Sequence, residues 1–257
     1  MTFRVIKATL FYGEFRSWFM GLSVIVGVLS DIDDPEDQAR FADLFKATAK
    51  AMIAANLPAH VEPTEIECWS AEGYGYSGLH ALREVAGLIW QGKPIPRAPL
   101  ITGKGETPFA EALFNQALAS CGPLKQPGFI ARLFGKPAPV ASLPPFSHLS
   151  MHSDAEGFYV PVNFETPIIP KVMDQATASI WPLGSTQRLQ SEIDHLAAVL
   201  EIPDGLTSQD ETLWEAIESP VTDQALWQAQ PVAAYSAIIL REACRASLAT
   251  GAAITFT

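Results

Sequence analysis

The densest set of side chains that could do chemistry lies between residues 148 and 156. It contains two histidines and two carboxylates, at His148, His152, Asp154 and Glu156. Imidazole nitrogens and carboxylate oxygens are common ligands of divalent metals, and they are also the usual general acids and bases. This segment is therefore the first candidate for a metal site or an active site.

The spacing of the two histidines opposes a metal site. Residues 147–152 and 158–164 alternate in polarity and residues 153–157 are typical of a turn, so the pattern predicts a β-hairpin. His148 and His152 would then share one face of a strand, but residues four apart on a strand are separated by ~13 Å. One ion cannot be ligated across that distance, so we predict no metal and no cofactor.

A small-molecule hydrolase or metal-dependent enzyme centred on the 152–156 turn is the alternative hypothesis. His152 would then assist Asp154 or Glu156 as a general base. No nucleophile stands at a recognisable spacing, because Ser77 lies in GYSGL rather than in the GxSxG pattern of a hydrolase elbow. We therefore predict no catalytic residues and a non-enzymatic protein, and keep the enzyme as the alternative.

A second polar feature is the acidic run SDIDDPED, which holds Asp31, Asp33, Asp34, Glu36 and Asp37. It is not an EF-hand loop, because counting from Asp31 puts Glu36 where that loop needs Gly and Ala42 where it needs Glu. Carboxylates at the start of a helix are favoured by the helix dipole. The run is either a solvated helix start or an anionic patch for a basic partner.

The elements that must position these side chains follow from periodicity and capping signals. Strands are predicted at 2–12, at 61–69 and at 252–257. The apolar run 17–29 is either a buried strand or a short buried helix, and its valines favour the strand. Helices are predicted at 35–55 after Asp34-Pro35, at 78–91 after a loop that ends at Ser77, at 107–120, and at 208–218 from a Ser208/Glu211 capping box. A helix at 185–200 would place Leu189, Ile193, Leu196 and Leu200 in phase on one face. The last helix, at 232–249, would be ended by Thr250-Gly251. This pattern predicts an α+β fold, rich in helix, with a small and mostly antiparallel sheet that includes the 147–164 hairpin.

The sharpest change of composition falls at residues 121–146, which contain six prolines and three glycines. Such a segment is a linker or a long surface loop. We predict a single α+β domain over residues 1–257, with this segment as the candidate internal boundary.

Composition and charge restrict the class of protein. The 257 residues are 48% hydrophobic, which is too apolar for a disordered chain. Seventeen Lys and Arg against 28 Asp and Glu give a net charge of −11, which disfavours nucleic acid and anionic membranes as ligands. The same charge suits a basic protein partner, although many acidic proteins are acidic for solubility alone.

The compartment is predicted from the apolar stretches and the cysteines. Residues 17–30 are uncharged but shorter than the ~20 residues that a membrane-spanning helix needs. Cys68, Cys121 and Cys244 are widely separated and odd in number, as expected for reduced thiols. We therefore predict a cytoplasmic protein with no membrane segment.

Three stretches resemble uncharacterised bacterial proteins of the toxin-immunity kind. They are HSDAEGFYVPVNF at 152–164 and, more loosely, GYSGLHALREVA at 75–86 and LGSTQRLQSEIDHLA at 183–197. The resemblance implies an acidic, cytoplasmic, non-enzymatic protein that binds a cognate toxin. It carries no functional residue over to this chain.

Charge and resemblance together favour an immunity-type inhibitor that covers the active site of a basic partner, such as a toxin, by charge complementarity. The sequence leaves the partner's identity and the oligomeric state open. The residues predicted to bind are Asp31, Asp33, Asp34, His152, Asp154, Glu156 and Tyr159.

Overall fold

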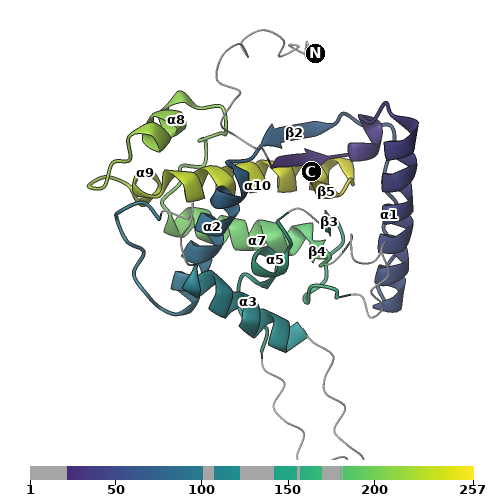
Figure 1. Ribbon diagram of the computed structural model, residues 1–257, viewed down its shortest axis with the longest axis horizontal. Coiled ribbons are helices and arrows are strands. Elements are labelled where there is room, and N and C mark those ends of the chain that lie inside the picture. The colour runs from purple at the N-terminus through teal and green to yellow at the C-terminus, as the bar shows by residue number, and fades with distance from the viewer. Residues whose placement is uncertain (1–21, 101–106, 122–141, 155–156, 170–179, 181) are drawn as a thin grey trace, which may run out of the picture.

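The fold is α+β, as predicted, in a computed structural model that describes residues 22–100, 107–121, 142–154, 157–169, 180 and 182–257 (Figure 1). The strands are β1 (Ser23–Val26), β2 (Trp69–Glu72), β3 (Phe158–Val160), β4 (Gly184–Ser185) and β5 (Ile254–Phe256). The helices are η1 (Val28–Ser30), α1 (Pro35–Ala54), α2 (Gly75–Trp90), α3 (Pro108–Cys121), α5 (Ser147–Met151), α7 (Thr186–Val199), α8 (Glu211–Glu218), α9 (Leu226–Ala229) and α10 (Pro231–Thr250).

The five strands form one sheet in the order β2-β1-β5-β3-β4. Three of the four strand pairs are antiparallel, and only β3 and β4 run parallel. In this register Val24 lies between Ala71 of β2 and Phe256 of β5. Among the described residues the sheet is therefore mostly antiparallel, and β2 is one of its two end strands.

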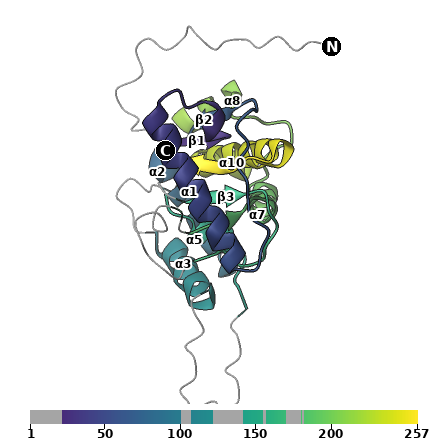
Figure 2. The same ribbon diagram turned by 90° about the vertical axis from the view of Figure 1, so that its right-hand side faces the viewer.

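Each face of the sheet is covered by helix. Because side chains alternate along a strand, Val24, Val26, Tyr159, Ile254 and Phe256 point to the face that packs with α2, α7 and α10. Their neighbours Phe158, Val160 and Ala253 belong to the cluster that contains Phe41, Phe45 and Met52 of α1. Figure 2, viewed from the α1 side, shows that helix crossing in front of the strands.

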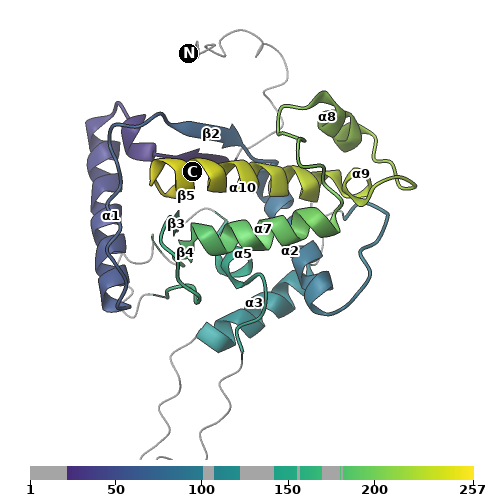
Figure 3. The ribbon, with the colours of Figure 1, turned by 180° about the vertical axis from the view of Figure 1, so that it is seen from behind.

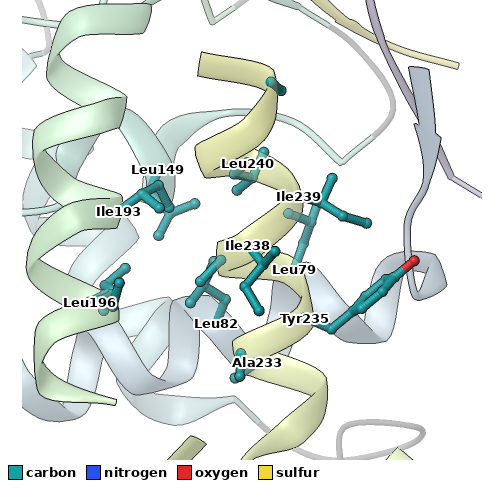
Figure 4. Close-up of a cluster of buried hydrophobic side chains, with 14 of the residues drawn as sticks. Leu79, Leu82, Leu149, Ile193, Leu196, Ala233, Tyr235, Ile238, Ile239 and Leu240 are labelled. Carbon is teal, nitrogen blue, oxygen red and sulfur yellow. The ribbon is translucent and has the colours of Figure 1, made fainter. Parts of the chain in front are cut away.

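The alanine-rich helix α10 is the centre of the larger core. Figure 4 shows it between α7 and α2, with Ile238 and Leu240 among side chains of those helices. On α7 the predicted spacing is confirmed, since Leu189, Ile193, Leu196 and Leu200 all have 0% exposure. Small alanines on α10 allow neighbouring helices to come close, which explains how so many elements share one helix.

Several helix boundaries were predicted correctly because their signals are local. Asp34 is the N-cap of α1, where its Oδ1 accepts from the backbone N–H groups of Glu36 at 2.8 Å and Asp37 at 3.1 Å. Ser185 caps α7. Gly251, with φ of 78°, ends α10 in the left-handed conformation that glycine adopts without a steric penalty.

The hairpin predicted at 147–164 is wrong. Residues 147–151 form the short helix α5, and β3 pairs with the distant strands β5 and β4 rather than with the preceding segment. The helix is stabilised because the side-chain oxygens of Glu192, on α7, accept from the N–H groups of His148 and Leu149. The ladder of β3 ends at Val160, before Pro161, which lacks an N–H group.

Three further boundaries differ from the prediction. The strand expected at 61–69 is found at Trp69–Glu72 instead. Helix α2 begins at Gly75, within the predicted loop, and the Ser77 hydroxyl donates to the Tyr74 carbonyl rather than capping the helix. Asp210 is the N-cap of α8, while Ser208 is bonded through its N–H and its hydroxyl to the carboxylate of Glu242.

Some predictions fall on residues outside those described. The strand at 2–12 and the beginning of the 17–29 run are among them, while the rest of that run contains β1. Residues 122–141 of the proline-rich segment are also outside, so the single domain with a candidate boundary there stays a prediction. No helix in the described part is both long and apolar enough to cross a membrane.

Candidate protein-binding surface

Asp154, one of the predicted binding residues, is held by two side chains of α2. Its carboxylate pairs with the Arg83 guanidinium and accepts from His80 Nε2 at 2.6 Å. Burial alone would raise its pKa, but the hydrogen bond from His80 and the charge of Arg83 lower the pKa to about 2. Asp154 is therefore ionised at neutral pH, and the positive charge of Arg83 compensates its negative charge.

Arg83 also fixes the chain around Asp154. Its Nε donates to the Leu149 carbonyl at 3.0 Å and one terminal nitrogen donates to the His152 carbonyl at 2.7 Å. A planar guanidinium can satisfy three acceptors in this way, and a lysine could not. The contacts join α2 to the turn between α5 and β3.

His152 and Tyr159, also predicted to bind, lie inside the protein. Their rings stack at 4.3 Å with 12° between the planes, and Phe256 packs against His152 at 4.7 Å. Burial, together with the charge of Arg83, lowers the pKa of His152 to about 3, so the ring is neutral at physiological pH. The Tyr159 hydroxyl donates to the His148 carbonyl at 2.9 Å. These two rings support the Asp154 turn rather than form a surface.

His148 is another neutral, buried histidine. Its Nδ1 accepts from the Ser185 N–H at 3.0 Å, so Nε2 carries the proton and donates to the Glu165 carbonyl. Burial lowers its pKa to about 4. A general base that works near neutral pH needs a pKa close to that range, so both histidines are placed for structure.

The 152–156 turn does not form a ligand set in the described residues. No three His, Cys, Asp or Glu side chains converge there or elsewhere in the described part closely enough to hold a metal ion. Glu156 lies outside the described residues. The contacts of His152 and Asp154 connect the turn before β3 to α2 and to the core.

The other predicted residues, Asp31, Asp33 and Asp34, are exposed. They lie between η1 and α1, and Glu36 and Asp37 continue the exposed run into the first turn of the helix. The structure does not bring them together with His152, Asp154 and Tyr159, which are held between α2 and the strands. They belong instead to a separate, acidic face of the molecule.

Two more carboxylates lie beside this run. The Ile66 N–H donates to Ser30 Oγ at 3.3 Å, which places the exposed Glu65 and Glu67 next to the start of α1. The pKa of the Cys68 thiol reports the same proximity, because burial and then the charge of Asp31 raise it to about 11. The chain continues directly into β2, whose last residue is the exposed Glu72.

Helix α8 extends the acidic face from the end of β2. The Tyr235 hydroxyl, on α10, donates to the Glu72 carbonyl at 2.9 Å, and the Tyr235 ring packs at 4.8 Å against Trp214 of α8. On α8 the exposed carboxylates lie at 211, 215 and 218, so they recur every turn, ~5–6 Å apart. Residues 189–240 hold nine Asp and Glu and no Lys or Arg.

We call this set of exposed carboxylates the acidic ridge. Figures 1 and 3 show its three parts, the start of α1, strand β2 and helix α8, along the same long side of the molecule. A DNA backbone likewise presents a row of negative charges, with one charge per ~3.4 Å of axis on each strand. The ridge consists of Asp31, Asp33, Asp34, Glu36, Asp37, Glu65, Glu67, Glu72, Glu211, Glu215 and Glu218.

Sequence reasoning missed most of the residues that organise these sites. Arg83 and Glu84 are charged residues inside a mostly apolar helix, and both are buried. Two charges at apolar helix positions could have indicated from the sequence that they make internal polar contacts. The α8 part of the ridge gave a weaker signal, which was the long stretch without a basic residue.

One of three comparisons with known proteins found a match. A search of the curated proteins and a search of the solved structures returned no match. One family profile matches residues 20–256, nearly the whole chain, including every part of the ridge. On that match, the chain belongs to the family described as "Putative DNA-mimic protein".

Proposed function

We propose that this protein is a non-enzymatic inhibitor that binds a basic DNA-binding protein through the acidic ridge. Membership of the DNA-mimic family supports a basic, DNA-binding partner. The observation that carries the proposal is the position of the ridge, in which three segments far apart in the sequence present exposed carboxylates along one side. A rigid row of carboxylates would occupy the Lys and Arg side chains that otherwise contact phosphates.

The finer proposal is an immunity-type role, in which the partner is a toxin and the ridge covers its active site. A nuclease toxin must bind DNA through a basic surface, and the same surface would accept the ridge. The support for this step is charge complementarity together with the resemblance at 152–164. Of the predicted binding residues, Asp31, Asp33 and Asp34 would contact the partner, while Asp154, His152 and Tyr159 would keep the frame rigid.

The alternative enzyme at the 152–156 turn has less support from the contacts. Both oxygens of Asp154 are engaged by Arg83 and His80, and the His152 ring is enclosed by Tyr159 and Phe256. These groups would have to break several contacts before they could reach a substrate.

The test is capture of proteins from a cell lysate on the immobilised full chain, followed by elution with duplex DNA. We expect the captured proteins to be DNA-binding, to be released by the competing duplex, and to bind less tightly as salt is raised. Each captured protein is then purified and its DNA binding or cleavage is titrated with the chain. Inhibition should be complete near a 1:1 ratio, with the partner chemically unchanged.

A matched pair of variants locates the surface. One variant neutralises Asp33, Glu67 and Glu215 on the ridge. The other neutralises three exposed carboxylates elsewhere, Glu111, Glu165 and Asp194, and so carries the same net charge. The ridge variant should lose at least tenfold in affinity and the second variant less than threefold, since close charge pairs matter more than net charge. Equal losses in both variants would contradict the proposal.

A further inference from the structure

Trp214 is an exposed tryptophan that is nevertheless held in place. Its residue is 40% exposed, although its neighbours in the chain include the buried Leu213 and Ala216. Its indole N–H donates to the Ser208 carbonyl at 3.2 Å, and its ring packs on Tyr235 at 4.8 Å. A large ring that is fixed on one side and accessible on the other loses little conformational entropy when it binds a partner.

The support behind Trp214 is itself anchored. Tyr235 donates to the Glu72 carbonyl, and the ring of Tyr74 meets the Tyr235 ring at 6.4 Å. Ser208, which receives the indole N–H, is fixed by two hydrogen bonds to Glu242 of 2.9 and 2.7 Å. The position of the indole is therefore set from α10 and β2, not only from its own short helix.

Carboxylates flank the ring on its own helix. Glu211 precedes Trp214 by three residues and Glu218 follows it by four, so both share its helix face. Both are exposed, and both belong to the acidic ridge. The ring is thus an aromatic platform between two negative charges.

Among the basic side chains of a partner, this arrangement fits arginine better than lysine. A guanidinium stacks flat on an indole and at the same time donates in its plane to carboxylates. The lysine ammonium is a compact and strongly hydrated charge, and it gains less from an aromatic face. We propose that Trp214, with Glu211 and Glu218, is the seat for an arginine of the basic partner, an inference that rests on the proposed function.

The test measures binding of fluorescently labelled nona-arginine and nona-lysine peptides to the full chain by anisotropy at one ionic strength. The protein should bind nona-arginine about fivefold more tightly, as expected for one exposed cation–π contact. In Trp214→Ala this preference should fall to about twofold or less, because only the carboxylates remain. The affinity for nona-lysine should change by less than twofold, because the ammonium gains less from the ring.

Two further variants separate this role from a loss of folding. Trp214→Phe keeps a ring on Tyr235 and should retain most of the preference for arginine. Leu248→Ala removes an exposed apolar side chain in the last turn of α10 and should leave both affinities unchanged. Thermal melting of each variant verifies that it is folded at the assay temperature.

The outcomes distinguish this inference from the proposed function. If Trp214→Ala keeps the full preference for arginine, or if the unmodified chain shows no preference, the proposed arginine site at Trp214 is refuted. The proposal that the acidic ridge binds a basic partner is not affected by that result. If neither peptide binds at low salt, or if binding does not depend on the ridge carboxylates, the proposed function itself fails.

Discussion

At the scale of single residues, the buried Glu192 carboxyl has the most measurable consequence. Glu192 as a residue is half-buried. Its carboxyl accepts from the N–H groups of His148 at 3.0 Å and Leu149 at 2.8 Å, which favour its charged form. Burial outweighs these bonds and raises the pKa to about 8. The folded protein therefore holds a proton that the unfolded chain releases near its ordinary pKa of about 4.3.

This difference makes stability depend on pH. Because the folded pKa is the higher one, the contribution of Glu192 is fully present below about pH 4.3 and is lost as pH rises through about 8. We expect the stability advantage of the unmodified protein over Glu192→Gln to shrink by on the order of 3 kcal/mol between pH 5 and pH 8. Urea unfolding of both proteins at several pH values measures it.

The comparison with Glu192→Gln also removes the effect of the buried histidines. Their depressed pKa values, about 4 for His148 and about 3 for His152, destabilise the fold as pH falls below about 6.5. That effect is present in both proteins and cancels in the difference. A constant difference across the pH range would contradict the assignment to Glu192.

At the scale of secondary-structure elements, helices α2 and α3 cross closely at Gly87. A Cβ atom at Gly87 would lie 2.3 Å from the backbone carbon and oxygen of Phe109, which cannot swing away. Nearby, the Glu84 carboxylate accepts from the Phe109 and Ala110 N–H groups at the start of α3. Gly87 and the buried carboxylate of Glu84 together allow the N-terminal end of α3 to pack against α2.

We expect Gly87→Ala to lower the free energy of unfolding by about 2 kcal/mol, because the two helices must separate. Alanine is the better helix former by ~1 kcal/mol, so the clash has to outweigh that gain. Gly205→Ala is the control, since no atom lies within 4 Å of the added Cβ. Urea denaturation should show a loss for the first variant and none for the second.

How far the sequence predicted the structure depends on how local the determining contacts are. The start of α1 and the end of α10 were predicted because Asp34-Pro35 and Gly251 act within one helical turn. The helical structure of residues 147–151 was not predicted, because α5 depends on Glu192, which lies more than 40 residues away in the chain. The fold class followed from periodicity, while the pairing of β3 with β4 and β5 did not.

The candidate site was predicted in one part only. The acidic run at Asp31, Asp33 and Asp34 was recognised, since those residues are adjacent in the chain. Glu72 and the α8 carboxylates join them through Tyr235 and Trp214, and a single sequence gives no measure of such contacts. His152 and Tyr159 are residue types that often form binding sites, but here their side chains are buried.

At the scale of the whole molecule, the net charge of −11 affects the free protein as well as its complexes. Like charges along the ridge repel one another, and at 0.1 M salt that repulsion is largely screened beyond ~10 Å. We expect the melting temperature to rise by about 3 °C, equivalent to ~1 kcal/mol, between 20 mM and 300 mM NaCl. Differential scanning calorimetry on the isolated protein measures this shift.

The variant with Asp33, Glu67 and Glu215 neutralised provides the comparison. It has less repulsion to screen, so it should melt at a higher temperature in low salt and respond less to added salt. A melting temperature that falls with salt would mean that exposed ion pairs, such as Arg40 with Asp37 at 3.0 Å, outweigh the repulsion.

In the part of the chain that the structure describes, β2 is an end strand of the sheet, and this has a consequence for the behaviour of the protein in solution. An end strand offers unpaired backbone groups to which a second molecule can add its own strand, and this is a frequent route to aggregation. Here Ser70 and Glu72 are exposed along that strand, Glu65 and Glu67 lead into it, and Tyr235 occupies the Glu72 carbonyl. We therefore expect these carboxylates to keep copies of the sheet from joining edge to edge, so that one set of charges would serve both recognition and solubility.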